Sequence, residues 1–305
     1  MTTTAERRRG LPLHPIAIGP LPRAVHSTGR YLALARAKPL GAVSLAIILV
    51  LVLAAVFADQ VAPYDPLTQN YTAVLQPPGA AHPFGTDNLG RDVFSRIIFG
   101  ARISLIVGLS AMLIGILGGT LLGLSSGYVG GWYELLVERV VDAWLAFPII
   151  LFALTIVAVL GAGVPQTIAA IGFVSIPGVS RVVRGATLAE KESTYILAAR
   201  SCGATGQRIM LRHVLPNLAA PLIVIASLTL ARAILTEASL SFLGVGVPPP
   251  DPAWGSMLSG ESRTYMLAAP WLAIWPGLAI SLAVMCWNML GDALRDLWDP
   301  RIRNV

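Results

Sequence analysis

The chain has 305 residues, of which 55% are hydrophobic and 12% are charged, and its formal net charge is +6. Soluble globular proteins carry about 25% charged residues, so this composition excludes a soluble fold and indicates many membrane-spanning helices. The basic residues stand at the ends of apolar runs, so the positive charge indicates membrane topology rather than nucleic-acid binding. The two cysteines, Cys202 and Cys286, lie in a polar loop and in an apolar run, and we expect no disulfide between them.

Residues 1–38 are basic and rich in proline, with no acid after Glu6. We expect a cytoplasmic tail without stable structure that touches anionic lipid. A cleaved signal peptide is the alternative, but the first apolar run begins far from Met1 and is too long for the apolar part of such a peptide. We therefore favour a retained first transmembrane helix at 39–58, long enough to cross a hydrocarbon core of about 30 Å.

A polar, proline-rich segment at 59–102 follows, and we expect it on the extracytoplasmic side. The uncharged stretch at 103–133 then holds a glycine at every fourth position: Gly115, Gly119, Gly123, Gly127 and Gly131. Glycines at this spacing line one helix face and allow a neighbouring helix to approach closely. The pattern therefore predicts helix packing, with a substrate groove on the same face as the alternative.

Three acids recur at the same spacing immediately afterwards: Glu134, Glu138 and Asp142, with Arg139 beside them. On a helix these acids share one face. We interpret them as a solvated face near the membrane, because nothing else in the chain supplies the context of a paired-carboxylate enzyme.

The remaining apolar runs complete six spans. The uncharged stretch at 143–180 exceeds one membrane crossing and contains a Gly/Pro interruption, so it predicts two spans with a tight turn. Residues 103–291 thus form a five-helix core, with a cytoplasmic loop at 184–217 and an extracytoplasmic loop at 237–270. The lysines and arginines place both termini, including the segment at 292–305, in the cytoplasm.

Arg232 and Glu237 are the charged residues closest to membrane depth in span five, which we predict from about Leu218 to Leu235. An ionisable group within a membrane is a functional hypothesis by default. Near the outer end of a span, however, an arginine can reach the interface or pair with a nearby glutamate. We favour this second interpretation.

The polar loop between spans four and five predicts two short helices with a sharp bend. Ser193 and Thr194 are suited to cap the first helix, and Gly203 is suited to end it in the left-handed conformation. The second helix is predicted at 206–214 and is stopped by Pro216. The apolar side of this hairpin, expected to face a partner, consists of Ile196, Leu197, Ile209, Met210 and Leu211.

The small and helix-ending residues of the hairpin follow a fixed spacing: Ala198, Ala199, Gly203, His213, Leu215 and Pro216. This spacing resembles the coupling loop of ATP-binding-cassette importer permeases. In that family the loop docks into a cleft of a separate ATPase subunit, so the resemblance implies that these six residues couple the chain to an ATPase. Leu197 stands where the family has a glutamate, a departure that removes a charge but leaves the helical pattern intact.

Four sequence blocks in the same order, at 82–108, 195–217, 237–258 and 288–303, resemble the C-type permease subunit of dipeptide and oligopeptide importers. The resemblance implies an all-α integral membrane protein with six transmembrane helices and the type I importer permease fold. It further implies a heterodimer with a second permease, two cytoplasmic ATPases that bind ATP and Mg²⁺, and an extracytoplasmic substrate-binding protein. The implied cargo is a dipeptide or oligopeptide; members of the family also carry nickel chelates, glutathione and other small solutes.

The extracytoplasmic loop begins EASLSFLGVGVPPPDPAWGSML, in which the prolines forbid a regular helix. Its rigidity and its side of the membrane make it our candidate for contact with the substrate or its binding protein. The candidate residues are Glu237, Pro248, Pro249, Pro250 and Trp254.

The sequence holds no phosphate-binding loop, no zinc-ligand spacing and no nucleophile elbow, and its four histidines are scattered. We therefore expect a transport subunit rather than an enzyme, with no cofactor or metal site in this chain. A proton-coupled secondary transporter is the alternative from another class. It would need an acid or histidine near mid-membrane and an inverted repeat, and neither is evident. A channel would need a filter-like segment, which is also not evident.

Overall fold

The structure, a computed structural model, describes residues 39–265 and 267–298. Within these ranges every regular element is a helix, which confirms the all-α prediction. The predicted cytoplasmic tail at 1–38 lies outside the described residues. The predicted C-terminal segment at 292–305 is described only to Trp298, and up to there it continues the last helix.

Five helices are long and apolar enough to cross a membrane: α2 (Pro39–Val56), α4 (Val93–Val129), α7 (Val164–Lys191), α11 (Ala219–Phe242) and α14 (Trp271–Trp298). A sixth crossing results if α5 (Gly131–Leu145) and α6 (Ile149–Leu160) count together, although they are bent by 86°. Five of the six predicted spans are therefore continuous helices, whereas a sixth crossing depends on the bent pair α5–α6. The shorter helices are α3 (Ala58–Val61), η1 (Tyr71–Ala73), α8 (Thr194–Ser201), α9 (Gly206–Ile209), η2 (Met210–Val214), α10 (Leu215–Asn217), α12 (Trp254–Met257) and α13 (Glu261–Tyr265).

The third span differs from its prediction. The sequence predicts a span that begins at Ala143, whereas the structure breaks the chain just before α6. Pro148 stands at this break, and proline has no backbone N–H and disfavours helical backbone at the residue before it. The predicted turn before the fourth span is confirmed, because Gly161 and Gly163 separate α6 from α7 with positive φ angles of 90° and 158°.

The long helix α4 begins at Val93, ten residues before the predicted start of the second span at Ile103. The Asp92 carboxylate caps it by accepting a hydrogen bond from the Ser95 N–H at 2.8 Å. At 1.5 Å per residue its 37 residues extend about 55 Å, which exceeds a hydrocarbon core of about 30 Å. The end of the segment at 59–102 is therefore a helical extension of α4.

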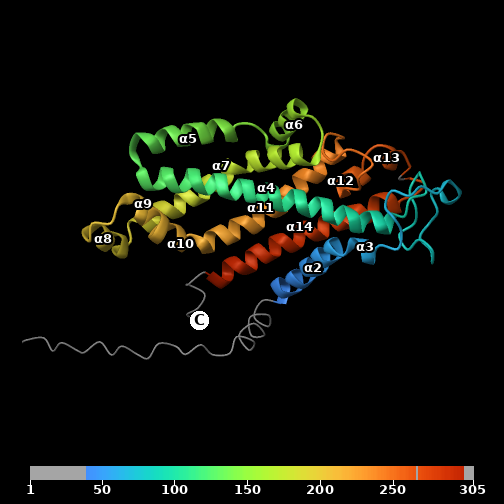
Figure 1. Cartoon of the computed structure of the whole chain (residues 1–305), viewed down its shortest axis with the longest axis horizontal. Coiled ribbons are helices and arrows are strands. Elements are labelled where there is room, and N and C mark those ends of the chain that lie inside the picture. Colours follow the sequence, from blue (N-terminus) through green and yellow to red (C-terminus); the bar gives the residue numbers. More distant parts are fainter. Residues whose placement is uncertain (1–38, 266, 299–305) are drawn as a thin grey trace, which may run out of the picture. The chain divides into compact units, whose positions relative to one another are not determined.

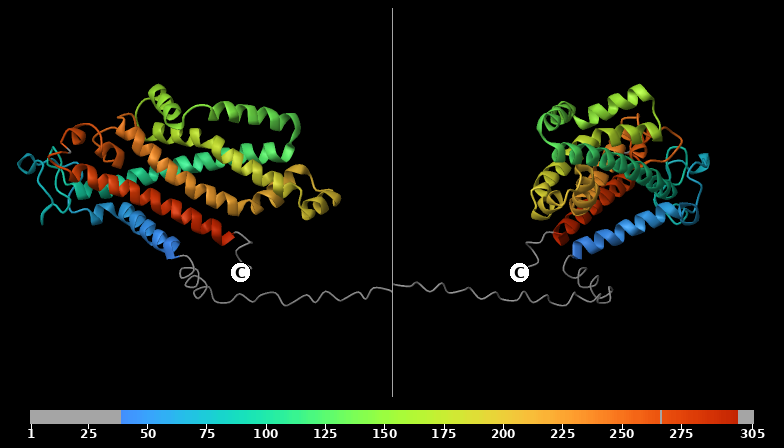
Figure 2. Two further views of the ribbon diagram at one scale, coloured as in Figure 1. Left: turned by 180° about the vertical axis from the view of Figure 1, so that it is seen from behind. Right: turned by 60° about the vertical axis from the view of Figure 1, so that its left-hand side comes forward.

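The glycine stripe of α4 faces α7, and the two helices lie side by side (Figures 1 and 2). A Cβ added at Gly123 would lie 2.4 Å from the Ser180 carbonyl oxygen, and one at Gly119 would lie 2.5 Å from the Val179 Cβ. This close approach confirms the predicted packing role, and α7 occupies the face considered as a substrate groove. Gly131 does not belong to the stripe, since it begins α5 and a Cβ there would meet nothing within 4 Å.

The three acids of α5 form ion pairs with α7 rather than a purely solvated face. The Arg184 Nε donates to Glu134 at 2.8 Å and lies 3.5 Å from Glu138, and both carboxylates are half-buried. Asp142 pairs with Arg181 at a more exposed position. Sequence alone missed these pairs because their partners lie about 40 to 50 residues further along the chain.

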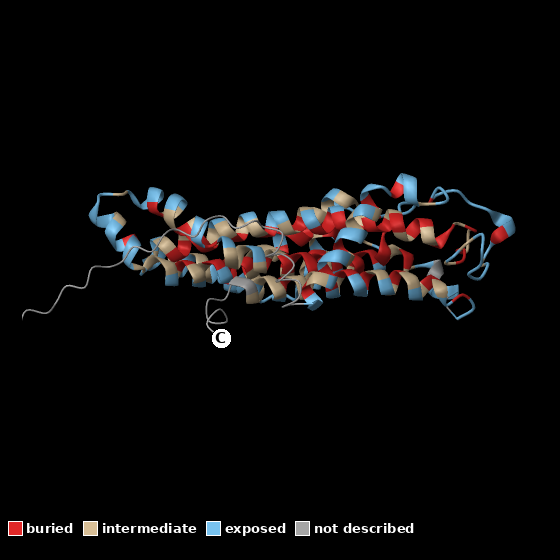
Figure 3. Cartoon of the chain, turned by 90° about the horizontal axis from the view of Figure 1, so that it is seen from below, coloured by how far each residue is buried: buried red, intermediate tan, exposed pale blue. Residues whose placement is uncertain are grey.

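Buried apolar side chains form clusters between the spans. One cluster joins α2, α4, α11 and α14, and a second joins α4, α6, α7 and α11. A third, here called the hairpin cluster, joins α4, α7 and α11 to α8 and α9. Large apolar side chains on the outward faces of α2, α4 and α6 are exposed, as lipid contact requires, and Figure 3 shows buried positions alternating with exposed ones along the helices.

Candidate functional site

The predicted hairpin begins with α8, directly after α7. Ser193 occupies the predicted N-cap position of this helix with an extended backbone, but its side chain does not make the predicted capping hydrogen bond. Gly203 adopts a φ angle of +81°, which confirms the predicted left-handed end of the helix. Its N–H donates to the Arg200 carbonyl at 2.9 Å and closes the last turn.

The second half of the hairpin runs into span five without a stop. It passes from α9 through the π-helical turn η2 and the short helix α10 into α11. The predicted stop at Pro216 is therefore wrong. Pro216 lies in the first turn of α10. The N–H groups of a first turn have no carbonyl partner within their own helix, so a proline there removes no hydrogen bond from α10.

The apolar side of the hairpin divides into an anchor and an exposed face. Ile196 and Ile209 are 0% and 1% exposed, and both belong to the hairpin cluster. Leu197 and Leu211 point away from it, with exposed fractions of 51% and 57%. Figure 1 shows α8 at one end of the helices, beyond the ends of α4 and α5. The hairpin is thus fixed to the spans on one side and open on the other.

The six predicted coupling residues follow the same division. Ala198, Gly203 and Pro216 are exposed, whereas Ala199, His213 and Leu215 are half-buried. A Cβ added at Gly203 would meet nothing within 4 Å. Among the described residues, no neighbouring atom limits the size of a side chain at position 203, and only the positive φ angle favours glycine there. A partner can therefore approach the backbone closely at this position.

A hydrogen-bonded clamp joins the two ends of the hairpin. The Tyr195 hydroxyl donates to Glu190 at the end of α7 and accepts from the Asn217 Nδ2 at 2.9 Å. The same Nδ2 donates to the His213 carbonyl at 2.7 Å. Burial, together with the Glu190 carboxylate, raises the pKa of Tyr195, so the hydroxyl stays protonated and able to donate. Sequence analysis gave Tyr195 and Asn217 no role, although they are the first and last residues of the recognised block.

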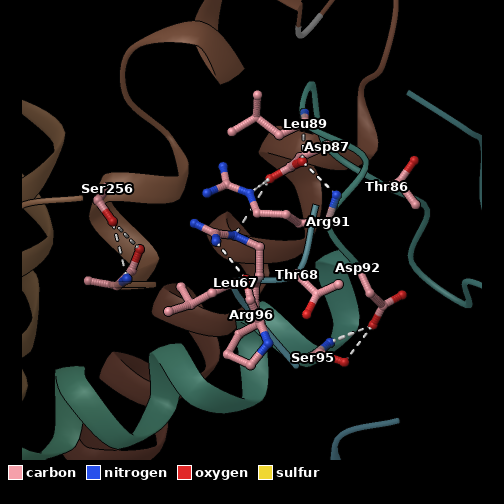
Figure 4. A network of polar contacts seen from close by, with 12 residues as sticks. Leu67, Thr68, Thr86, Asp87, Leu89, Arg91, Asp92, Ser95, Arg96 and Ser256 are labelled. Carbon is pink, nitrogen blue, oxygen red and sulfur yellow. Dashed lines mark hydrogen bonds and ion pairs between the residues drawn. The ribbon is translucent and has the colours of Figure 1, made fainter. Parts of the chain in front are cut away.

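At the other end of α4 an ion-paired network borders a cavity of about 480 Å³ (Figure 4). Asp87 accepts hydrogen bonds from the Leu89 N–H at 2.9 Å and from the Arg91 Nε at 2.6 Å, and its carboxylate lies 3.7 Å from the Arg96 Nε. Arg96 also donates to the Pro66 carbonyl at 3.0 Å. Sequence analysis quoted this block as part of a resemblance but did not predict the network.

The candidate outer-contact residues separate into exposed prolines and a buried tryptophan. Pro248, Pro249 and Pro250 are exposed, and the last two line the cavity. Trp254 is 0% exposed, and its indole N–H donates to the Ile97 carbonyl at 3.0 Å. In this conformation Trp254 therefore positions the loop against α4 and does not reach an outside partner.

Glu237 is also enclosed, because α11 extends to Phe242 instead of ending near Leu235. Its carboxylate accepts hydrogen bonds from the Ser104 hydroxyl at 2.9 Å and from the Ser241 hydroxyl at 2.8 Å. The expected pairing with Arg232 is not formed, and the longer helix places Arg232 near the middle of α11 rather than near its end.

The sequence was compared with known families and proteins. The family model described as binding-protein-dependent transport system inner membrane component matches residues 119–304. The model described as the N-terminal TM domain of oligopeptide transport permease C matches residues 35–78. The chain belongs to this permease family.

Among similar proteins, the glutathione transport system permease protein GsiD of Pectobacterium atrosepticum is 45% identical over 258 residues, covering 84% of this chain and 85% of that protein. The proteins of the same name from Escherichia coli and Shigella boydii are 45% identical over 257 residues, covering 84% of each chain.

As a permease of this family, the chain is a multi-pass inner-membrane component of an ATP-binding-cassette importer, with the type I permease fold, and not an enzyme. The match at 119–304 includes most of the glycine stripe, the hairpin and the loop before α14. The match at 35–78 includes α2. Membership of the family implies ATPase and substrate-binding-protein partners.

Proposed function

We propose that this chain and a second permease subunit form the translocation pathway of an ATP-driven importer of small peptides. Two separate ATPase subunits would bind ATP and Mg²⁺, and an extracytoplasmic binding protein would deliver the cargo. The 45% identity to glutathione transport permeases makes glutathione, itself a tripeptide, the first cargo to test. Longer peptides and nickel chelates are the cargoes to compare with it.

The division of the hairpin into anchor and exposed face is the observation that carries this proposal. Leu197, Ala198 and Gly203 lie open to a partner, while Ile196 and Ile209 are embedded among side chains of α4, α7 and α11. Because packed interiors transmit displacement, an ATPase that moves the docked hairpin moves these helices with it. The Tyr195 clamp keeps the hairpin closed during that movement.

This mechanism requires the hairpin and both chain termini to lie in the cytoplasm, as the distribution of basic residues favours. The cavity at the other end of α4 then faces the binding protein. The exposed prolines at 248–250 are our candidate contact with that protein.

A pair of glycine variants tests the coupling role. Gly203 and Gly161 have φ angles of +81° and +90°, and a Cβ at either meets nothing within 4 Å. A tryptophan at each position therefore imposes similar backbone strain, but only Gly203→Trp places an indole on the hairpin. Because overpacking a close contact costs about 1–3 kcal/mol, we expect ATP-dependent uptake into proteoliposomes to fall about tenfold or more in Gly203→Trp and to persist in Gly161→Trp.

Equal uptake by the two variants would refute the coupling role. Uptake by the wild-type complex that a proton uncoupler abolishes at constant ATP would instead favour a secondary transporter.

The outer contact is tested with a matched pair of prolines. Pro248 and Pro78 are both exposed, but only Pro248 belongs to the candidate contact. We expect Pro248→Arg to weaken binding-protein affinity about fivefold or more, and Pro78→Arg to leave it unchanged. Surface plasmon resonance on the reconstituted permease measures both, and unchanged affinity in Pro248→Arg would remove this residue from the contact.

A further inference from the structure

Arg232 is a charged residue near the middle of α11, a helix long and apolar enough to span a membrane. It stands 13 residues after the first residue of α11 and 10 before the last, which correspond to about 20 Å and 15 Å along the helix axis. Ionisable residues within a span are costly in lipid, and they face a water-filled or protein-lined space where they mark ion or substrate pathways. A guanidinium at this depth therefore requires a polar or anionic neighbour.

The described part of the chain supplies no such neighbour for Arg232. Its guanidinium makes no ion pair or hydrogen bond with any described residue, and Glu237, the next acid on α11, is already held by two serines. Arg102, near the outer end of α4, shows the contrast because it pairs with Asp59 at 2.9 Å. The neighbour of Arg232 is therefore not among the described residues.

Arg232 lines a cavity of about 330 Å³ between the α5–α6 break, α7 and α11. Most of the lining is apolar. Thr229 and Thr236 share the helix face of Arg232, three residues before it and four after it, and Ser175 faces the cavity from α7. The hydroxyls of Thr236 and Ser175 donate to carbonyls of their own helices at 2.8 Å and 2.7 Å. The Thr229 hydroxyl has no hydrogen-bond partner among the described residues.

We infer that Arg232 binds a carboxylate of the peptide cargo during its passage through the permease. The inference rests on the proposed import of small peptides, and it deepens that function by assigning a substrate contact. A guanidinium can donate two parallel hydrogen bonds to one carboxylate, and Thr229 adds a neutral donor beside it. The apolar walls exclude water and strengthen these bonds. About 330 Å³ is the lower end of the range for small-molecule sites, which suits one half of a pathway shared with a second permease.

The rival occupant is an acidic side chain of the second permease. Such a fixed pair would occupy the cavity permanently, and desolvation would cancel much of its contribution to stability. A peptide carboxylate, in contrast, is present in every unmodified cargo molecule and leaves the cavity after passage. We therefore favour a carboxylate of the cargo, which binds only during passage, over a fixed acidic side chain as the partner of Arg232.

Charge variants at this position separate the two occupants. The complex of both permeases and both ATPases is reconstituted with ATP inside the vesicles and glutathione-loaded binding protein outside, as wild type, Arg232→Gln, Arg232→Lys and Arg139→Gln. Arg139 is exposed on α5 and does not line the cavity, so its variant controls for loss of one positive charge. Uptake of glutathione, ATP hydrolysis stimulated by the binding protein, and subunit stoichiometry are measured for each.

We expect Arg232→Gln to lower uptake about tenfold or more, because a hydrogen-bonded charged partner is lost, while stimulated ATP hydrolysis and stoichiometry persist. Arg232→Lys should retain more uptake than Arg232→Gln, and Arg139→Gln should match the wild type. Unchanged uptake in Arg232→Gln would overturn the inference, and loss of the second permease from this variant would assign Arg232 to the subunit interface instead. If wild-type vesicles show no ATP-dependent uptake of glutathione or other small peptides, the proposed function itself fails and this inference fails with it.

Discussion

The hairpin at one end of α4 and the segment at 237–258 at its other end differ in which motif residues are exposed and which are buried. On the hairpin, Ala198 and Gly203 are exposed, and two buried isoleucines are enough to anchor them. At the other end, Glu237 of α11 and Trp254 of α12 are fully buried, whereas the prolines at 248–250 between them are exposed. A recognisable string of residues therefore combines two roles, contact with a partner and positioning of the segment that makes the contact.

The difference arises from how each segment is held. The two ends of the hairpin are joined by the local clamp of Glu190, Tyr195 and Asn217, and its buried side packs against α4, α7 and α11. The segment at 237–258 is fixed by contacts that span long stretches of chain, such as Trp254 with Ile97 and Glu237 with Ser104. Substitutions of exposed hairpin residues should consequently affect coupling more than stability. Substitutions of buried residues in the other segment should mainly lower stability.

The largest expected effect is on stability at the buried end of the outer loop. Trp254→Ala removes a fully buried indole that lies against Gly100 and donates to the Ile97 carbonyl. We expect a loss of about 3–5 kcal/mol, because the cavity left behind collapses only partly. Trp132→Ala, at a residue 78% exposed, should change stability by less than about 0.5 kcal/mol. Thermal unfolding of the purified permease measures both, and similar midpoints for the two variants would contradict the positioning role.

A somewhat smaller effect is expected in the network of Figure 4. Asp87→Asn keeps the shape of the side chain but leaves Arg91 and Arg96, both largely buried, without their carboxylate. We expect a loss on the order of 3 kcal/mol and faster proteolysis of the outer segment at 59–92. Asp251→Asn, at an exposed residue of the same cavity, is the matched control and should be near neutral. Equal protease resistance of all three proteins would show that the network does not hold this segment.

The smallest effect on stability is expected on the exposed face of the hairpin. Leu197→Glu restores the glutamate typical of the family at a residue 51% exposed, and it should change stability by less than about 0.5 kcal/mol. Ile196→Ala, one residue earlier and fully buried, should cost about 2–5 kcal/mol. Chemical unfolding of both variants tests this contrast, and a large loss of stability in Leu197→Glu would mean that the face is not free.

Sequence reasoning succeeded where the relevant physics is local or periodic. The four-residue spacing of glycines predicts a close helix contact, because glycines at this spacing lie on one face of α4 and all meet the same neighbouring helix, α7. Gly203 predicts the left-handed end of α8 because few other residues adopt that conformation readily. The lengths of the apolar runs predict the five helices that are long enough to cross a membrane.

Sequence reasoning failed where tertiary contacts decide the outcome. The polar residues after Leu235 look like the start of a loop, but Glu237 and Ser241 are satisfied by each other and by Ser104 of α4, so the helix continues. With that extension, Arg232 lies near the middle of α11 instead of near the end of the predicted span. The break before α6 had a local signal in Pro148, which the length of the apolar run concealed.

The proposed coupling requires an ATPase to cover the exposed face of the hairpin, and the two native cysteines provide a direct test. Cys202 is exposed on the hairpin, whereas Cys286 is buried in α14. The permease pair is labelled with a maleimide before and after addition of the ATPase subunits, and the modified cysteine is identified by mass spectrometry. We expect Cys202 labelling to slow about tenfold or more in the assembled complex and to recover when the ATPases are removed, with Cys286 unlabelled throughout. An unchanged rate at Cys202 in a complex that hydrolyses ATP and imports cargo would contradict it.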